Sequence, residues 1–256
     1  MLVEQILLEP LLLGFLVAIL VALTGVGGGA VMTPALVLLL DVPLGIAIGT
    51  DLLYIVVTKA VAVSKHAGHG QVRWDLVRGL TLGSLPAVVI VLGLMALFGE
   101  VDGGVVYQPA VALALIFTAI VLIGGQGLRD RLQVFSRVPA HILLPVTGAL
   151  LGGLVALSSI GAGAIGVTAI LLVAPSIAGR KLVATDLAQA FPLAVFAGIG
   201  HAVMGNVDYQ LLLYLVIGAV PGALLGCQLC GRVPKDVLLK GVGFMLLTIS
   251  ISMIIV

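Results

Sequence analysis

Eight apolar segments alternate with short polar stretches along the chain, four in each half. Each is long enough for at least one membrane-spanning helix, which needs about 20 predominantly apolar residues. The segments are residues 11–40, 44–64, 76–98, 105–125, 140–173, 183–204, 210–229 and 238–256. The first and the fifth are too long for one span, too short for two, and contain a run of small residues in the middle. The pattern predicts an all-α integral membrane protein in which each half has one broken segment and three transmembrane helices.

The second half of the chain repeats the first at an offset of 135 residues, which takes residue 50 to residue 185. Thr50-Asp51-Leu52 then falls on Thr185-Asp186-Leu187. The further matches in register are His66 with His201, Gly70 with Gly205, Trp74 with Tyr209, and Pro86 with Pro221. Chance rarely produces agreement of polar residues, Gly and Pro in register, so the chain is predicted to be a duplication. Its units are an N-terminal repeat, residues 1–128, and a C-terminal repeat, residues 138–256.

The composition agrees with a membrane protein and argues against other classes. Hydrophobic residues make up 61% of the chain and charged residues 9%, whereas soluble domains carry about 25% charged residues. The formal net charge of +1 predicts no nucleic-acid surface. Cys227 and Cys230 are expected to be small buried residues, because neither a second cysteine pair nor a His cluster accompanies them. We therefore expect no cofactor and no bound metal.

The distribution of Lys and Arg predicts how the broken segments lie. Basic residues mark the cytoplasmic loops of membrane proteins. If residues 11–40 and 140–173 enter and leave the membrane on the cytoplasmic side, every Lys and Arg except Lys59 lies on that side. Each half then has three crossings and a re-entrant hairpin, and the halves are inverted relative to each other, as in many secondary transporters. Eight ordinary crossings are the alternative.

The two breaks are the candidate substrate site. Inverted repeats with broken helices place binding sites near the membrane midplane. A helix that starts at a glycine-rich break offers free N–H groups and a partial positive charge to an anion. With the neighbouring hydroxyls, the candidate substrate-binding residues are Thr24, Gly25, Gly27, Gly28, Gly29, Thr50, Ser158, Ser159, Gly161, Gly163 and Thr185. The alternative is that these glycines only permit close helix packing.

Polar residues inside the predicted helices are candidates for coupling or gating, namely Asp51, Lys59, Asp186 and Gln189. Ionisable residues within a membrane are costly and usually serve a function, here a proton relay, a gate or a counter-charge. Asp51 and Asp186 could instead be helix-start carboxylates that the helix dipole stabilises. Lys59 could extend its side chain to the inner surface. His66 and His201, which end two predicted helices, are expected as capping or interface residues, with pH sensing as the alternative.

These motifs resemble the sulfite exporter TauE/SafE family of membrane permeases over nearly the whole chain. In the first half the resemblance rests on Gly25-Val26-Gly27-Gly28-Gly29, Pro34, Gly49-Thr50, Gly70-Gln71-Val72-Arg73-Trp74, and Gly83 with Pro86. The second half carries Gly161-Ala162-Gly163, Thr185-Asp186, Gly205-Asn206-Val207-Asp208-Tyr209 and Pro221-Gly222. The resemblance implies a multi-pass permease of the cytoplasmic membrane that exports sulfite, sulfoacetate or a related sulfur-containing anion.

Secondary transport of such an anion is therefore the expected function. The chain has no glycine-rich phosphate-binding motif that ends in Gly-Lys-Ser or Gly-Lys-Thr, which argues against ATP hydrolysis by the chain itself. The expected partners are a small anion and the lipid bilayer, with a homodimer left open and no nucleic acid. We do not expect an enzyme. A passive anion channel and an intramembrane enzyme are the alternatives, of which the channel is favoured.

Overall fold

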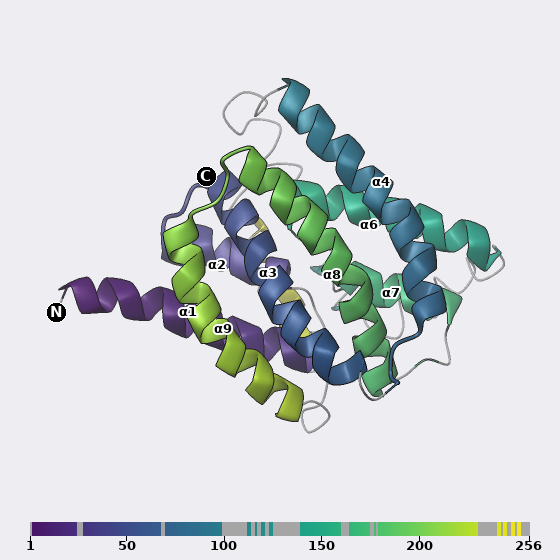
Figure 1. Ribbon diagram of the computed structural model, residues 1–256, viewed down its shortest axis with the longest axis horizontal. Coiled ribbons are helices and arrows are strands. Elements are labelled where there is room, and N and C mark those ends of the chain that lie inside the picture. The colour runs from purple at the N-terminus through teal and green to yellow at the C-terminus, as the bar shows by residue number, and fades with distance from the viewer. Residues whose placement is uncertain are drawn as a thin grey trace.

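A computed structural model of the chain describes residues 2–24, 28–67, 70–98, 139–159, 164–174, 177 and 179–229, with parts of 112–124 and 240–251. Every regular element within these ranges is a helix. In chain order the named elements are α1 (Leu2–Thr24), the short 3₁₀ helix η1 (Gly28–Ala30), α2 (Met32–Leu39), α3 (Leu44–Ala67), α4 (Trp74–Phe98), α6 (Ala140–Ser158), α7 (Ala164–Val173), α8 (Gly179–Val203) and α9 (Tyr209–Leu229) (Figure 1). The prediction of an all-helical protein is confirmed over the described ranges.

Each predicted broken segment contains two helices on either side of its small residues. The first helices are α1, with 23 residues, and α6, with 19. α6 is long and apolar enough to cross a hydrocarbon core, whereas the apolar part of α1, Leu8–Leu23, is shorter. The second helices, α2 with 8 residues and α7 with 10, are too short. α1 also begins at Leu2, well before the predicted start at residue 11, and contains Pro10. The predicted helices 105–125 and 238–256 lie mostly outside the described residues.

The outward-facing surface of the helices suits lipid. Five helices in the described ranges are long and apolar enough to cross a membrane, namely Leu44–Ser64, Trp74–Leu97, Ala140–Ser158, Lys181–Val203 and Tyr209–Leu229. On α4, the side chains of Leu82, Val89 and Leu97 are 72%, 59% and 81% exposed. Water would disfavour such a surface, whereas lipid tails are as apolar as leucine. The chain is thus a multi-pass membrane protein.

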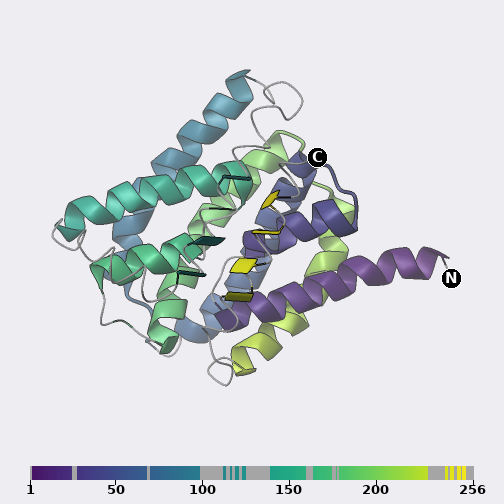
Figure 2. The ribbon, with the colours of Figure 1, turned by 180° about the vertical axis from the view of Figure 1, so that it is seen from behind.

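The helices form a central pair with an outer pair on each side. α3 and α8 run through the middle, α1 packs on α9 along one side, and α4 packs on α6 along the other (Figure 1). Seen from behind, α1, α2, α6 and α7 lie in front of the central pair (Figure 2). Under the sequence repeat α1 corresponds to α6 and α4 to α9, so the two outer pairs are equivalent to each other.

Glycines bring the backbones of each outer pair into direct contact. At each of these glycines an added Cβ would overlap the backbone of the facing helix. The contacts are Gly14 with Leu215 and Gly218 with Leu11 between α1 and α9, and Gly148 with Leu80 and Gly83 with Pro145 between α4 and α6. Small residues that permit such close approach are a principal source of packing energy between membrane helices.

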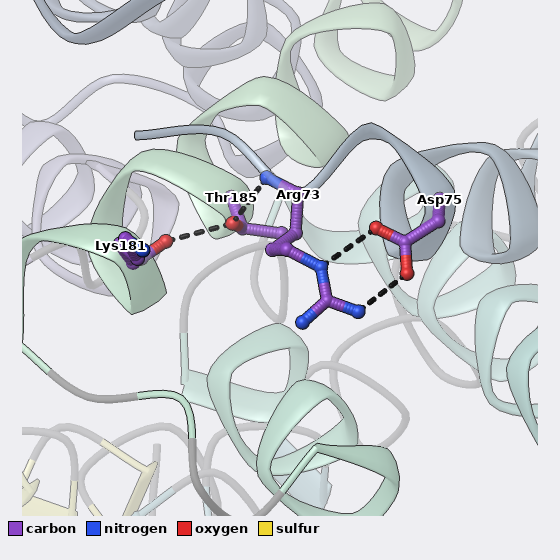
Figure 3. A network of polar contacts seen from close by, with 4 residues as sticks. All are labelled: Arg73, Asp75, Lys181 and Thr185. Carbon is purple, nitrogen blue, oxygen red and sulfur yellow. Dashed lines mark hydrogen bonds and ion pairs between the residues drawn. The ribbon is translucent and has the colours of Figure 1, made fainter. Parts of the chain in front are cut away.

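The two central helices run antiparallel, and each is bound near its start to the loop of the other half. The backbone N–H of Asp208, which follows α8, donates to the hydroxyl of Thr50 in α3 over 3.0 Å. The N–H of Arg73, which follows α3, donates to the hydroxyl of Thr185 in α8 over 3.1 Å (Figure 3). Thr50 corresponds to Thr185 in the repeat, and Arg73 to Asp208. The same contact is therefore made twice, once toward each end of the central pair.

The turns that lead into these two loops share one construction. Gly70 and Gly205 have φ angles of +62° and +82°, a left-handed conformation that glycine adopts readily. No atom lies within 4 Å of an added Cβ at either residue, so backbone conformation rather than packing requires glycine there. The matched glycines of the sequence repeat thus correspond to a matched turn.

Candidate functional site

Asp51 and Asp186 are the residues that follow the two threonines of the central helices. Both side chains are fully buried, with 0% exposed surface. Neither carboxylate lies at a helix start, because α3 and α8 begin well before them and have no acidic residue in their first turns. The alternative of a dipole-stabilised helix-start carboxylate is therefore wrong, since that effect is confined to the first turn. Each buried acid must be stabilised by other groups, and the two acids differ in how this is done.

Asp51 accepts hydrogen bonds from two hydroxyls. Thr33 of α2 donates to its Oδ2 over 2.6 Å, and Ser159, which follows α6, donates to the same oxygen over 2.8 Å. Its Oδ1 has no hydrogen-bond partner among the described residues and faces Gly28, where an added Cβ would come within 3.7 Å of that oxygen. Hydrogen bonds from hydroxyls to a carboxylate are short and strong. They hold one oxygen of Asp51 in place and leave the other available.

The two breaks of the chain meet beside Asp51. Gly29 of η1 lies so close to the backbone and hydroxyl of Ser159 that an added Cβ would overlap them. Ser159 has a left-handed backbone conformation, with φ of +57° and ψ of −3°, and directly ends α6. Residues from the first break and from the second, far apart in the sequence, therefore line the same interior region.

Asp186 has no such donors. Among the residues that the structure describes, neither of its carboxylate oxygens has a hydrogen-bond partner, and neither amide atom of the buried Gln189 has one. Both side chains face Gly166 in the first turn of α7, where an added Cβ would overlap Oδ1 of Asp186 and come within 3.5 Å of Oε1 of Gln189. A buried polar atom without a partner lowers the stability of a protein by about 1–3 kcal/mol, so these atoms of Asp186 and Gln189 destabilise the fold.

Lys59 is the buried cation beside these acids. Its side chain is 0% exposed, and no described residue forms a hydrogen bond with its Nζ. It interacts electrostatically with Asp186 and, less strongly, with Asp51. The alternative that Lys59 extends to the surface is wrong, because α3 lies in the middle of the bundle, enclosed by α8 and α9.

The remaining candidate residues have separate positions. Thr50 and Thr185 hold the contacts between the halves, and Thr185 also donates to the carbonyl of Lys181 over 2.7 Å (Figure 3). Ser158 is buried and donates to the carbonyl of Leu154 over 2.7 Å within α6. Gly25, Gly27, Gly161 and Gly163 lie outside the described residues, as does the side chain of Thr24, whose backbone ends α1. His201 is an interface residue, since its buried Nε2 lies 2.9 Å from the carbonyl oxygen of Ala156.

Sequence reasoning missed Thr33 and Gly166. Thr33 donates to Asp51, and Gly166 makes room for Asp186 and Gln189. A signal for the first was present, because Thr33 matches Thr168 at the same offset that aligns the two Thr-Asp pairs. Nothing in the sequence singles out Gly166 among the 34 glycines of the chain.

Known proteins match the chain over nearly its whole length. Residues 11–253 match the family described as sulfite exporter TauE/SafE. A probable membrane transporter protein of Bacillus subtilis, YjnA, is 35% identical over 87% of this chain and 89% of its own length. YdhB, another probable membrane transporter protein of that organism, is 27% identical over 89% of this chain and 92% of its own length. A probable membrane transporter protein of Haemophilus influenzae is 26% identical over 95% of this chain and 96% of its own length.

No solved structure matches the chain. The family match, the names of the relatives and the five apolar helices agree with one another. The chain is a membrane transporter that belongs to the sulfite exporter TauE/SafE family.

Proposed function

We propose that this protein is a secondary transporter that exports a small sulfur-containing anion, such as sulfite or the organosulfonate sulfoacetate, across the cytoplasmic membrane. The family description supports sulfur-containing anions as the substrate class. One observation carries the proposal: hydroxyls on α2 and at the end of α6 converge on a single, fully buried carboxylate oxygen of Asp51.

A carboxylate oxygen and a sulfite or sulfonate oxygen are stabilised by the same kinds of hydrogen-bond donor. Each carries partial negative charge and accepts short hydrogen bonds from hydroxyl or N–H donors. The donor pair of Thr33 and Ser159 is therefore suited to an oxyanion. Gly28 and Gly29 let the backbone of the first break come close to Asp51 and Ser159, the residues of this donor arrangement. The substrate would bind at this meeting point of the two breaks.

Asp51 competes with the substrate in this arrangement. While its carboxylate holds both hydroxyls, a second anion at the same donors would meet its charge at short range. Binding then requires Asp51 to take up a proton or to turn away. The first of these events links anion binding to the uptake of one proton, which is the requirement for proton-coupled transport and supports a coupling role for Asp51.

The proposed architecture is a pair of inverted repeats, residues 1–128 and 138–256, whose breaks face each other. Support comes from the antiparallel course of α3 and α8, which occupy equivalent positions in the two halves. The equivalent packing of α1 on α9 and of α6 on α4 agrees with it. Such repeats are usual in secondary transporters, where one half moves against the other around a central site.

Flux of radiolabelled sulfite and sulfoacetate in proteoliposomes, with and without a pH gradient, tests this function. We expect wild-type protein to move at least one of these anions and to respond to the gradient. Thr33→Val should weaken apparent affinity by about tenfold or more, because a hydrogen bond to an ion contributes about 1.5–3 kcal/mol. The control is Thr58→Val, which removes a buried hydroxyl that donates only within α3.

Three outcomes would contradict the proposal. Flux that ignores the gradient and survives Asp51→Asn would indicate a passive channel. Consumption of sulfite without translocation would indicate an enzyme. No flux of any sulfur-containing anion, from protein that unfolds cooperatively in detergent, would refute the substrate class.

A further inference from the structure

The two equivalent acids of the central helices receive different numbers of hydrogen bonds. Asp51 receives two hydroxyl donors, whereas Asp186 receives none from the residues that the structure describes. The sequence accounts for part of this difference, because the residue that aligns with Ser159 is Gly25, which has no hydroxyl. The charge of the buried Lys59 acts on Asp186 instead, and Lys59 aligns with Ala194 in the other half. Packing agrees, because Ala62, less than one turn after Lys59, packs with Val183 and Leu187 around Asp186. The asymmetry is thus built into the residues and not only into their packing.

Lys59 and Asp186 do not satisfy each other. They interact electrostatically, yet Nζ of Lys59 and both carboxylate oxygens of Asp186 lack hydrogen-bond partners in the part of the chain that the structure describes. A direct ion pair is the usual way for two buried opposite charges to offset the cost of desolvation. Here Asp186 lies against Gly166 of α7 instead, and the ammonium keeps its three N–H donors unused.

The unused donors at this place suit an oxyanion. Lys59 offers three N–H groups and a positive charge, and the Nε2 of Gln189 offers two more N–H groups. Both side chains are fully buried, with 0% exposed surface. Gly166 belongs to the first turn of the ten-residue helix α7, whose N-terminal end adds partial positive charge. A cation would be repelled by Lys59, whereas a sulfonate or sulfite oxygen would find several donors.

We propose that Lys59 and Gln189 form a second oxyanion subsite of the transporter and that Asp186 takes up a proton when the anion binds there. The inference rests on the proposed function and adds to it a separate location and a charge balance. With Lys59 protonated and Asp186 ionised, the pair is neutral, and an anion would leave one excess negative charge in a buried region. A proton delivered from solution to the Asp186 carboxylate restores neutrality and removes the repulsion between carboxylate and ligand.

The surroundings of Asp186 contain few other groups that could titrate in its place. From α3, the charge of Lys59 acts on Asp186. Arg73 and Asp75, at the start of α4, pair with each other over 2.6 Å at the surface, with side chains 50% and 58% exposed. The hydrogen bond to Asp75 and the charge of that carboxylate raise the pKa of Arg73, so this arginine stays protonated.

Within the residues that the structure describes, α8 and the other elements packed against it carry few further titratable groups. Within its described residues α7 carries no ionisable side chain, and α6 carries only the exposed His141 at its start. On α8 itself, Lys181 is exposed and lies more than one turn before Asp186, and the buried His201 lies in the last turn, at the other end of the helix. Arg78 of α4 is exposed. Proton uptake that accompanies anion binding at this subsite is therefore assigned to Asp186.

The test is equilibrium binding of methanesulfonate, sulfoacetate and sulfite to the purified protein in detergent, by calorimetry at several pH values. Methanesulfonate is the diagnostic probe, because its own charge does not change over the pH range in which proteins stay folded. We expect wild-type affinity for it to rise by about tenfold for each unit of falling pH, the slope for one proton taken up per anion. Lys59→Met and Gln189→Leu should each weaken binding by about tenfold or more.

Asp186→Asn separates the proton from the anion. This variant should bind methanesulfonate at all pH values with a flat pH profile, because its side chain is neutral throughout. The matched control is Lys181→Met, which removes an exposed lysine of the same helix and should bind like wild type. Thermal unfolding of each variant shows whether it is folded, and Lys59→Gln serves in place of Lys59→Met if the latter fails.

The inference and the proposed function fail in different ways. If wild type binds the anions, Thr33→Val weakens binding, and Lys59→Met and Gln189→Leu do not, the second subsite is wrong and the first survives. A pH slope that persists in Asp186→Asn would overturn the proton assignment. Absence of oxyanion binding to folded wild type would overturn both.

Discussion

The substitution Thr33→Val tests whether a hydroxyl stabilises the buried carboxylate of Asp51. Thr33 is 1% exposed, and its Oγ1 donates to Oδ2 of Asp51 over 2.6 Å. Valine has nearly the same shape as threonine, so the change removes the donor and leaves packing almost intact. Ser159 stays as the remaining donor to the same oxygen.

The expected loss follows from the charge of the acceptor. A hydrogen bond to an ionised group contributes about 1.5–3 kcal/mol to stability, whereas a bond between neutral groups contributes about 0.5–1.5 kcal/mol. We therefore expect Thr33→Val to lower the free energy of unfolding by about 2 kcal/mol when Asp51 is ionised. In an Asp51→Asn background the same substitution should cost about 1 kcal/mol, since the amide oxygen still accepts but carries no charge.

Reversible unfolding by sodium dodecyl sulfate in mixed micelles, followed by circular dichroism, measures these differences. The control is Thr58→Val, a buried hydroxyl at 2% exposure that donates only to the carbonyls of Tyr54 and Ile55 in its own helix. Those carbonyls retain their helical hydrogen bonds, so the control should cost less than about 1 kcal/mol. A cost for Thr33→Val no larger than for the control, in both backgrounds, would refute the assignment of the hydroxyl to Asp51.

Three further predictions concern packing and topology. Gly29→Ala should lower the free energy of unfolding by about 1–3 kcal/mol, because its Cβ overlaps the backbone of Ser159. The control Gly93→Ala, whose Cβ meets nothing within 4 Å, should be neutral or stabilising. Equal thermal unfolding of the two variants would contradict the meeting of the breaks. Thr50→Val and Thr185→Val each leave one backbone N–H without its acceptor. Each should lower the free energy of chemical unfolding by about 1–2 kcal/mol, and the two losses should add in the double variant. A clear loss for only one variant would show that the two contacts are not equivalent. Arg78 and Gln210 are exposed. In a background without Cys227 and Cys230, Arg78→Cys and Gln210→Cys should react with a membrane-impermeant maleimide from opposite sides of the membrane. Labelling of both from the same side would exclude inverted repeats.

The amino-acid sequence by itself determined the class of protein, the course of its helices and its duplication. A membrane helix is set by the length of an apolar run, which is a local property of the chain. The predicted segments 44–64, 76–98 and 210–229 accordingly became α3, α4 and α9 with ends shifted by only a few residues at most. Matched residues such as Gly70 and Gly205 also marked the same turn twice.

The roles of individual polar residues were only partly predictable. The repeat singled out Asp51 and Asp186 as a pair, and both are buried in the central helices. It did not distinguish them, because the donors that reach Asp51 lie 18 and 108 residues away in the sequence. Which hydroxyl meets which carboxylate depends on how α2, α3 and α6 converge.

Only the tertiary structure decided the surroundings of Lys59 and Gln189. A lysine within an apolar run can reach the membrane surface if its helix lies at the edge of a bundle, but not if that helix is enclosed. α3 is enclosed, so the charge of Lys59 remains inside and acts on Asp186. Burial of a polar atom is a property of every helix around it, and the sequence of one helix cannot specify it.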